Sequence, residues 1–215
     1  PACQATLKES ELEQLRLKIA EVVKQNVLPF SATLWGWNYG FDYAPTKYRL
    51  HASHQQVHQQ YALLPEEVES YSGKLDANLG NIPSYGCGDM IRKVIEEYDE
   101  LHNRDFFQDY RAAIFGNERM DGEKEKPSSL IIWQDENVIV FIPKAQTSQW
   151  EIQIMTIPDE ENRLVGNILE ADTAIRASLN RAIFMAQKSL YGLGAEMVTS
   201  IEYPKRFHHR GIMQP

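Results

Sequence analysis

The stretch His51-Ala-Ser-His54-Gln-Gln56-Val-His58-Gln-Gln60-Tyr-Ala-Leu-Leu-Pro65 holds three of the protein's six histidines and has the composition of a β-strand. On an extended chain, side chains two residues apart share one face. The polar residues that share a face in this way are His54, Gln56, His58 and Gln60. An imidazole between uncharged hydrogen-bonding groups suits a nucleophile or an acid–base group that handles an anion such as phosphate. The alternative is a solvated face of an antiparallel sheet.

The bulk composition is that of an ordinary globular protein. With 215 residues, the chain is long enough for one large domain or two small ones without disulfide support. Lys and Arg number 22 against 30 Asp and Glu, and the resulting net charge of -8 argues against general binding to nucleic acid or to an anionic membrane. Any anion that binds must therefore be attracted by local groups.

The cysteines and the hydropathy indicate a cytoplasmic protein. Cys3 and Cys87 are too few for a disulfide framework, and they lack the paired spacing of a zinc site. The sequence holds neither an apolar run long enough to cross a membrane nor a signal-peptide pattern. The chain begins at Pro1 without an initiator methionine, which indicates a processed product or a fragment.

The first third of the chain predicts one helix and two strands. Ser10 and Glu13 form a capping box ahead of an apolar stripe, so a helix is expected from Ser10 onward. Strand-forming residues follow at 31–37 and 48–64. Residues 66–85 show little periodicity and are expected to form a surface connection.

The remaining two thirds alternate between helices and strands. Helices are predicted for 89–102, 106–114 and 168–190, and strands for 130–133, 138–142, 150–157 and 196–203. A charged stretch at 116–127 is expected to be a loop. The order helix, two strands, helices, three strands, helix, strand points to an α+β protein whose sheet is largely antiparallel with packed helices.

The histidine-rich strand also matches a family pattern. Ala52-Ser53 precede Gln56-Val-His58-Gln-Gln60, and Leu63-Leu64-Pro65 follows. This arrangement resembles the strand motif His-x-His-x-Gln of the galactose-1-phosphate uridylyltransferase group within the histidine-triad superfamily. His58 falls on the family's nucleophilic second histidine, Gln60 on its glutamine, and Gln56 on its first histidine.

The resemblance continues downstream and implies a tandem, histidine-triad-like (HIT-like) fold. Asn137-Val-Ile-Val-Phe-Ile-Pro143-Lys and Trp150-Glu-Ile-Gln-Ile-Met155 look like the start of the second half of such enzymes. Residues 1–65 would then be the later part of a first half that carries the histidine motif. Residues 66–127 would form a connection with helices, and residues 128–215 the second half. The first half is incomplete because its opening strands are missing, which suggests a truncated or divergent member.

The chemistry that the resemblance implies is transfer of a nucleoside monophosphate by double displacement. An imidazole, here His58, attacks the α-phosphorus of a sugar nucleotide or dinucleoside polyphosphate, and a phosphorylated acceptor then takes the nucleotide. Gln60 would donate its amide to a phosphoryl oxygen as charge builds there. Gln56, Ser53 and His54 are the other candidate substrate-binding residues, although Ser53 reaches phosphate only if the strand bends or bulges. No cofactor is implied.

Gln56 departs from the family pattern. In some relatives the first histidine helps to hold a structural zinc together with upstream cysteines, but an amide is a poor zinc ligand and this chain has no cysteine pair. We therefore expect no metal at this site. Two other functions stay open, namely a non-catalytic nucleotide or phosphate binder and a nucleotide hydrolase of the same fold. The sheet edge left by the missing strands suggests a homodimer.

A second cluster of cationic and imidazole groups lies near the end of the chain, at Lys205-Arg206-Phe207-His208-His209-Arg210. Arginine forks match phosphate oxygens, so the cluster could serve a phosphate site. Terminal clusters of this kind are more often solvated, and solvation is the expectation here.

Overall fold

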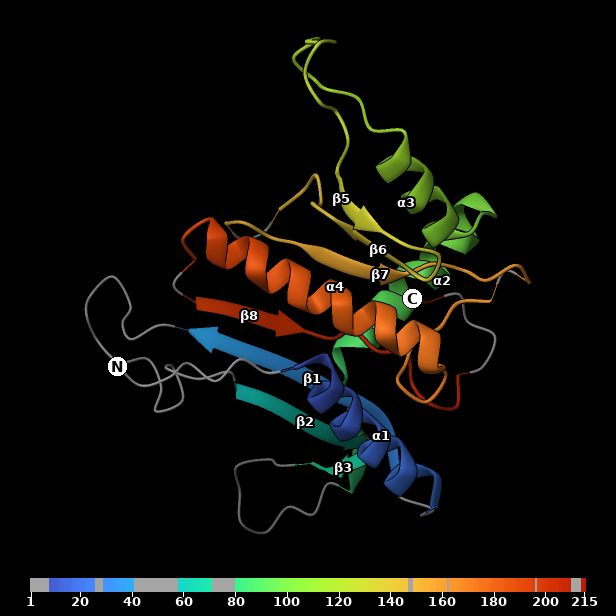
Figure 1. Ribbon diagram of the computed structural model, residues 1–215. Coiled ribbons are helices and arrows are strands. Elements are labelled where there is room, and N and C mark those ends of the chain that lie inside the picture. The colour runs from blue at the N-terminus through green and yellow to red at the C-terminus, as the bar shows by residue number, and fades with distance from the viewer. Residues whose placement is uncertain are drawn as a thin grey trace, which may run out of the picture.

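The computed structural model describes residues 8–25, 29–40, 58–70, 80–146, 149–161, 163–195, 197–209 and 214–215. In chain order its elements are α1 (Glu9–Gln25), β1 (Phe30–Gly40), β2 (His58–Pro65), β3 (Glu67–Glu69), β4 (Asn81–Pro83), α2 (Cys87–His102), α3 (Phe106–Phe115), β5 (Ile131–Gln134), β6 (Val138–Phe141), β7 (Gln153–Thr156), α4 (Thr173–Gly192) and β8 (Met197–Ile201). The described strands form antiparallel sheets of order β2-β1-β8, β3-β4 and β5-β6-β7 (Figure 1). The predicted α+β class and the antiparallel pairing are confirmed.

The central strand of the β5–β6–β7 sheet is apolar on both faces. All four side chains of β6 are fully buried. Successive strand residues point to opposite faces, and the residues of β6 divide between two clusters accordingly. Val138 and Val140 pack with Ala182 of α4, whereas Ile139 and Phe141 pack with residues of α3. A continuous apolar run is what a strand covered on both faces requires.

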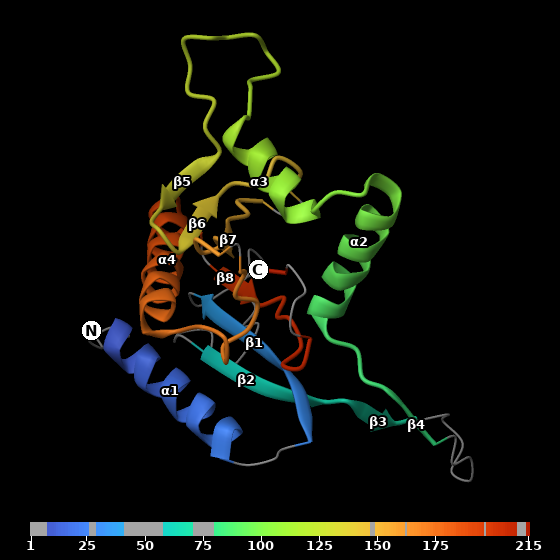
Figure 2. The same ribbon diagram turned by 90° about the vertical axis from the view of Figure 1, so that its right-hand side faces the viewer.

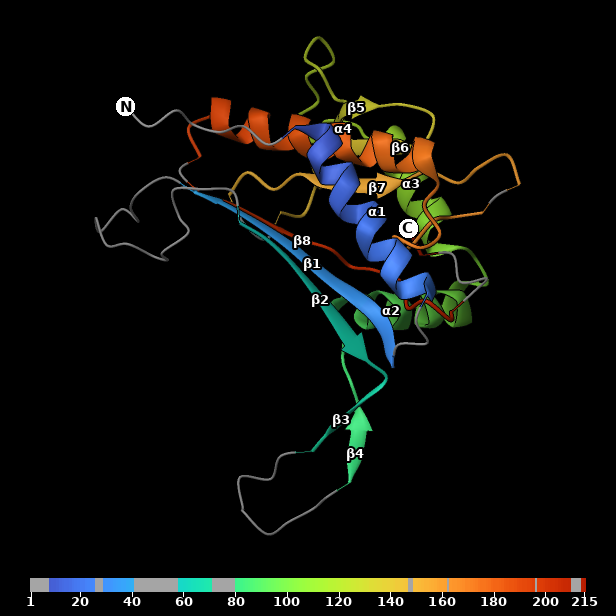
Figure 3. The ribbon, with the colours of Figure 1, turned by 60° about the horizontal axis from the view of Figure 1, so that its bottom comes forward.

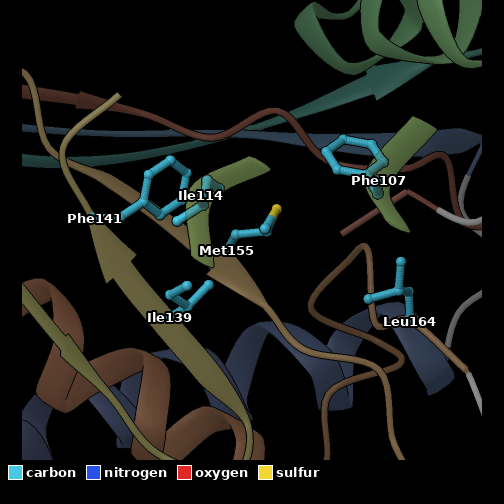
Figure 4. Packing of buried hydrophobic residues seen from close by; sticks show 6 residues of the cluster. All are labelled: Phe107, Ile114, Ile139, Phe141, Met155 and Leu164. Carbon is cyan, nitrogen blue, oxygen red and sulfur yellow. The ribbon is translucent and has the colours of Figure 1, made fainter. Parts of the chain in front are cut away.

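The main apolar cluster joins this sheet to α3 and to the chain before α4. Figure 4 shows six of its side chains, which are Phe107, Ile114, Ile139, Phe141, Met155 and Leu164. Phe107 and Ile114 lie on one face of α3 at helical spacing, and Asp105 begins that helix by accepting a hydrogen bond from the Gln108 amide at 2.7 Å. The cluster fixes α3 on the sheet.

The β2–β1–β8 sheet joins segments that are distant in sequence. Thr33 of β1 lies opposite Leu63 of β2, and Trp37 lies opposite Ser200 of β8. Helices α1 and α4 lie on the same side of this sheet and pack on each other (Figure 3). On the other side Ala62 is exposed and Ile201 keeps 56% of its surface exposed. Since β8 pairs with β1, residues assigned to the first and last predicted segments share one sheet, and the division into halves stays a prediction.

Helix α1 begins one residue before the predicted capping box. Glu9 and Ser10 are already helical, and the Lys8 amide donates to Glu11 Oε2 at 2.8 Å. Glu13 is therefore not the capping residue. It instead accepts a hydrogen bond from Arg176 Nε of α4 at 2.8 Å, which ties the two helices together.

Residues 66–85 are not merely a connection, because they contain the β3–β4 hairpin. All six residues of these strands are exposed, and the pairing runs from Glu67 opposite Pro83 to Glu69 opposite Asn81. The hairpin projects away from the helices beyond the end of β2 (Figures 2 and 3). Its apolar content is too small to give the periodicity that predicts a buried strand.

Candidate active site

The motif strand pairs regularly with β1 at the end that carries His58. His58 begins β2 opposite Asn38, and Gln60 lies opposite Gly36, whose partner on the other side is Ile201. For His58 and Gln60 the structure describes the backbone alone. Ser53, His54 and Gln56 lie outside the described residues. The two-residue spacing of His58 and Gln60 thus falls on a regular strand, while the grouping of all five side chains stays a prediction.

The other end of the β1–β2 ladder contains a β-bulge. Phe30 pairs with Pro65 and Ala32 with Leu64, so Ser31 is one extra residue on β1. Ser31 is buried, and its hydroxyl donates to the Leu64 carbonyl at 3.5 Å. The bulge therefore lies between the first two pairs of the ladder that carries the motif.

The guanidinium of Arg206 donates hydrogen bonds to the bulge and to the chain after β4. Its Nη1 donates to Ser31 Oγ at 2.5 Å, and its Nη2 donates to the Ser84 carbonyl at 2.7 Å. The next residue, Phe207, donates its amide to the Ser31 carbonyl at 2.7 Å. Ser84 Oγ in turn donates to the Pro65 carbonyl at the end of β2. One guanidinium thus connects β1, the chain after β4 and, through Ser84, the end of the motif strand.

A buried ion pair with α2 fixes the same guanidinium. Arg206 Nε and Nη2 donate to the two carboxylate oxygens of Asp89 at 2.7 and 2.6 Å, in the bidentate geometry that arginine favours. These hydrogen bonds lower the pKa of Asp89 and raise that of Arg206, so both groups stay charged. Asp89 also accepts the Gly86 amide at 2.8 Å, which begins α2.

The expectation of a solvated basic tail is wrong for Lys205 and Arg206, whereas His208 is exposed and Arg210 lies outside the described residues. Lys205 and Arg206 are only 3% and 8% exposed, because each is paired with a carboxylate. Lys205 Nζ lies 2.8 Å from Glu170 Oε2. The tail also packs so closely on α2 that a Cβ at Gly88 would lie 1.9 Å from the Pro204 carbonyl oxygen. The sequence shows the charges but not the distant acids that neutralise them.

Two histidines, His208 and His209, lie shortly after the buried Lys205 and Arg206. His208 Nε2 lies 3.4 Å from Glu66 Oε1, and its ring packs edge-on against that of His209 at 4.5 Å between centroids. Burial lowers the pKa of His209, and the positive charge of nearby groups, His208 first among them, lowers it further. His209 is thus held in its neutral form at neutral pH.

A polar cluster lies on the face of the β2–β1–β8 sheet that α1 covers. Thr33 Oγ1 donates to Glu202 Oε2 at 3.2 Å, and the guanidinium of Arg16 from α1 is fully buried nearby. Burial raises the pKa of Glu202 to about 7, although Thr33 and Arg16 both favour the charged form. Sequence reasoning missed this cluster, because a glutamate is usually exposed and no local pattern marks Glu202 as buried.

Two hollows among the described residues lie away from this sheet. One of about 520 Å³ opens between α3 and the loop after it, with Tyr110, Asn117 and Lys144 in its wall. None of its lining residues belongs to the β2–β1–β8 sheet. Within the described part of the chain, no three His, Cys, Asp or Glu side chains are grouped as a metal site would require. The absence of zinc at Gln56 stays a prediction, because that residue is not described.

Comparison with known proteins identifies the fold. No family model matches the sequence, and a search of curated proteins finds no match. A solved structure of a uridylyltransferase mutant superposes on 93% of this chain with a TM-score of 0.58 at 13% identity. The chain spans about half of that protein, 52% of its length. The protein therefore has a uridylyltransferase-like fold. In addition, none of the helices described is long and apolar enough to span a membrane.

Proposed function

We propose that the protein is a nucleotidyltransferase that passes a nucleoside monophosphate through a covalent intermediate on His58. The observation that supports this most is the position of His58 and Gln60 at two-residue spacing on a regular strand of a uridylyltransferase-like fold. The donor would be a sugar nucleotide or a dinucleoside polyphosphate, and the acceptor a phosphorylated compound.

The proposed reaction uses an imidazole nitrogen twice. Neutral His58 attacks the α-phosphorus, a P–N bond forms, and the P–O bond to the departing phosphate compound breaks. A phosphate oxygen of the acceptor then attacks the same phosphorus, and the P–N bond breaks to regenerate His58. Gln60 would donate its amide to the non-bridging oxygens as charge builds, a contact whose removal costs roughly 100-fold or more in rate at comparable oxyanion sites.

Labelling tests the covalent step. The protein is incubated with radiolabelled UDP-glucose, ATP, a GDP-sugar and dinucleoside polyphosphates, and the expected product is an acid-labile, base-stable label. His58→Ala should abolish the label, and Gln60→Ala should slow its appearance. His102→Ala is the matched control, since His102 is an exposed histidine near the end of α2. No label with any donor would rule out the transferase.

A second candidate function is non-catalytic binding of a nucleotide or phosphate, which the amide at Gln56 favours because a histidine stands there in the family. It predicts nucleotide affinity that is unchanged in His58→Ala, together with no label. A hydrolase, in which water replaces the acceptor, would form the label transiently and release nucleoside monophosphate, so analysis of the products distinguishes it.

A further inference from the structure

We propose that Arg206 is a positioning residue for the motif strand. Its guanidinium holds the β1 bulge at Ser31 and so sets the register that decides which sheet face carries His58 and Gln60. The catalytic consequence rests on the proposed function, whereas the structural claim does not.

The register matters because strand residues alternate between faces. A slip of one residue between paired strands moves every side chain of the slipped strand to the opposite face. In the observed register Thr33 lies opposite Leu63, on the face where Glu202 and α1 lie. After such a slip, positions 58 and 60 of β2 would fall on the same face of the sheet as Thr33.

The bulge at Ser31 is the place where we propose that the register between β1 and β2 is set. Between the pairs Phe30–Pro65 and Ala32–Leu64, β1 contains Ser31 and β2 contains no residue. A bulged residue lies outside the regular ladder, so its backbone groups need other partners. The Phe207 amide supplies one of them, at 2.7 Å from the Ser31 carbonyl oxygen. The side chain of Ser31 meets Arg206 Nη1 at 2.5 Å.

The other strand is held by the same group. Ser31 Oγ donates to the Leu64 carbonyl, and Ser84, whose carbonyl accepts Arg206 Nη2, donates its hydroxyl to the Pro65 carbonyl. Both strands of the ladder are therefore fixed relative to one buried cation. A lysine could not replace it, because a single ammonium cannot span Asp89 in bidentate fashion and also reach two serines on different segments.

The experiment measures the register directly. In isotope-labelled protein, nuclear Overhauser contacts between the backbones of Asn38 and His58, and of Gly36 and Gln60, report the native pairing. In Arg206→Gln and in Arg206→Lys we expect the ratio of native to slipped pairing to fall roughly tenfold, the scale of losing a hydrogen bond to a charged group. Arg163→Gln is the control, because Arg163 also binds an aspartate but is exposed. An unchanged ratio of native to slipped contacts in a folded Arg206→Gln would overturn the proposal.

A milder variant decides the matter if Arg206→Gln does not fold. Ser31→Ala leaves the Arg206–Asp89 pair intact and removes the side-chain link to the bulge. Weakened Asn38–His58 contacts support the proposal, and unchanged contacts overturn it. Labelling of His58 gives a separate readout, in which the maximal rate should fall in proportion to the lost pairing while KM for the donor stays constant. If the unaltered protein takes no label, the proposed function fails but the register result stands.

Discussion

The two three-stranded sheets are stabilised in opposite ways. The β5–β6–β7 sheet is held by apolar contacts on both faces, and the side chains of its central strand are fully buried. The β2–β1–β8 sheet instead contains Ser31 and Thr33 among its buried residues, and buried arginines lie beside it. Apolar packing tolerates small adjustments, whereas hydrogen bonds demand one geometry. The second sheet is thus suited to holding a site, and the first to supplying stability.

The largest effect is expected in the apolar sheet. Phe141→Ala removes a fully buried ring from the contact with α3, and we expect the free energy of unfolding to fall by about 3–5 kcal/mol. Urea unfolding followed by circular dichroism measures the change. Ile132→Ala on neighbouring β5, where the side chain is 40% exposed, is the control and should cost less than about 1 kcal/mol. Equal losses in the two variants would contradict the division between the sheets.

The next effect tests whether the polar sheet depends on its ion pair. Asp89→Ala leaves Arg206 buried without its carboxylate, and we expect a loss of about 3 kcal/mol. The matched control is Asp159→Ala, because its partner Arg163 has an exposed side chain and exposed ion pairs contribute little to stability. Thermal unfolding of both variants gives the comparison. If Asp89→Ala loses no more stability than Asp159→Ala, the Arg206–Asp89 ion pair does not stabilise the β2–β1–β8 sheet.

A pH-dependent effect should appear at Glu202. Its pKa is raised from 4.5 to about 7 in the folded protein, so the folded state binds the proton more tightly than the unfolded state. This contribution to stability is present below pH 4.5 and is lost as pH rises to about 7. Glu202→Gln cannot ionise, and its stability relative to the unaltered protein should rise by about 2–3 kcal/mol between pH 5 and 8.

Unfolding by urea at several pH values checks the Glu202 prediction. Glu161→Gln, at an exposed residue, serves as the control and should show no such trend. A difference between Glu202→Gln and the unaltered protein that is constant with pH would mean that Glu202 ionises normally.

The smallest effect concerns α4, which packs on β6 and β7 and also on α1. Asp172 accepts the Ile175 amide at 2.9 Å and begins the helix. Asp172→Ala should cost about 1 kcal/mol, and Asp172→Asn, which keeps an acceptor, should cost much less. Hydrogen exchange of the first-turn amides of α4 would reveal the change. First-turn exchange in Asp172→Ala equal to that of the unaltered protein would show that the cap contributes nothing.

The sequence predicts the apolar sheet better than the polar one, and the reason is the range of the interactions. The run Val138-Ile-Val-Phe141 identifies β6 by itself, since only a doubly covered strand needs it. Helix α4 is also predicted, but it begins at Thr173 rather than at 168. The Asn167 side chain binds the Leu169 and Glu170 amides there and turns the chain first.

The candidate site is harder to predict from local sequence patterns. His58 and Gln60 are found because a strand motif is local. The burial of Arg206 is not predicted because its partners Ser31 and Asp89 lie 175 and 117 residues away in sequence. No local pattern distinguishes a cation that is solvated from one whose acid arrives from another element.

The pairing of β1 with β8 also has a consequence for how the chain folds during synthesis. Strand β1 leaves the ribosome more than 150 residues ahead of β8 and Arg206. Closing so long a loop is slow, and unpaired strands are exposed to aggregation in the meantime. The apolar β5–β6–β7 sheet, whose strands adjoin in sequence, can assemble first. We expect the motif strand to be among the last parts of the molecule to reach its native pairing, and refolding yield to depend on protein concentration.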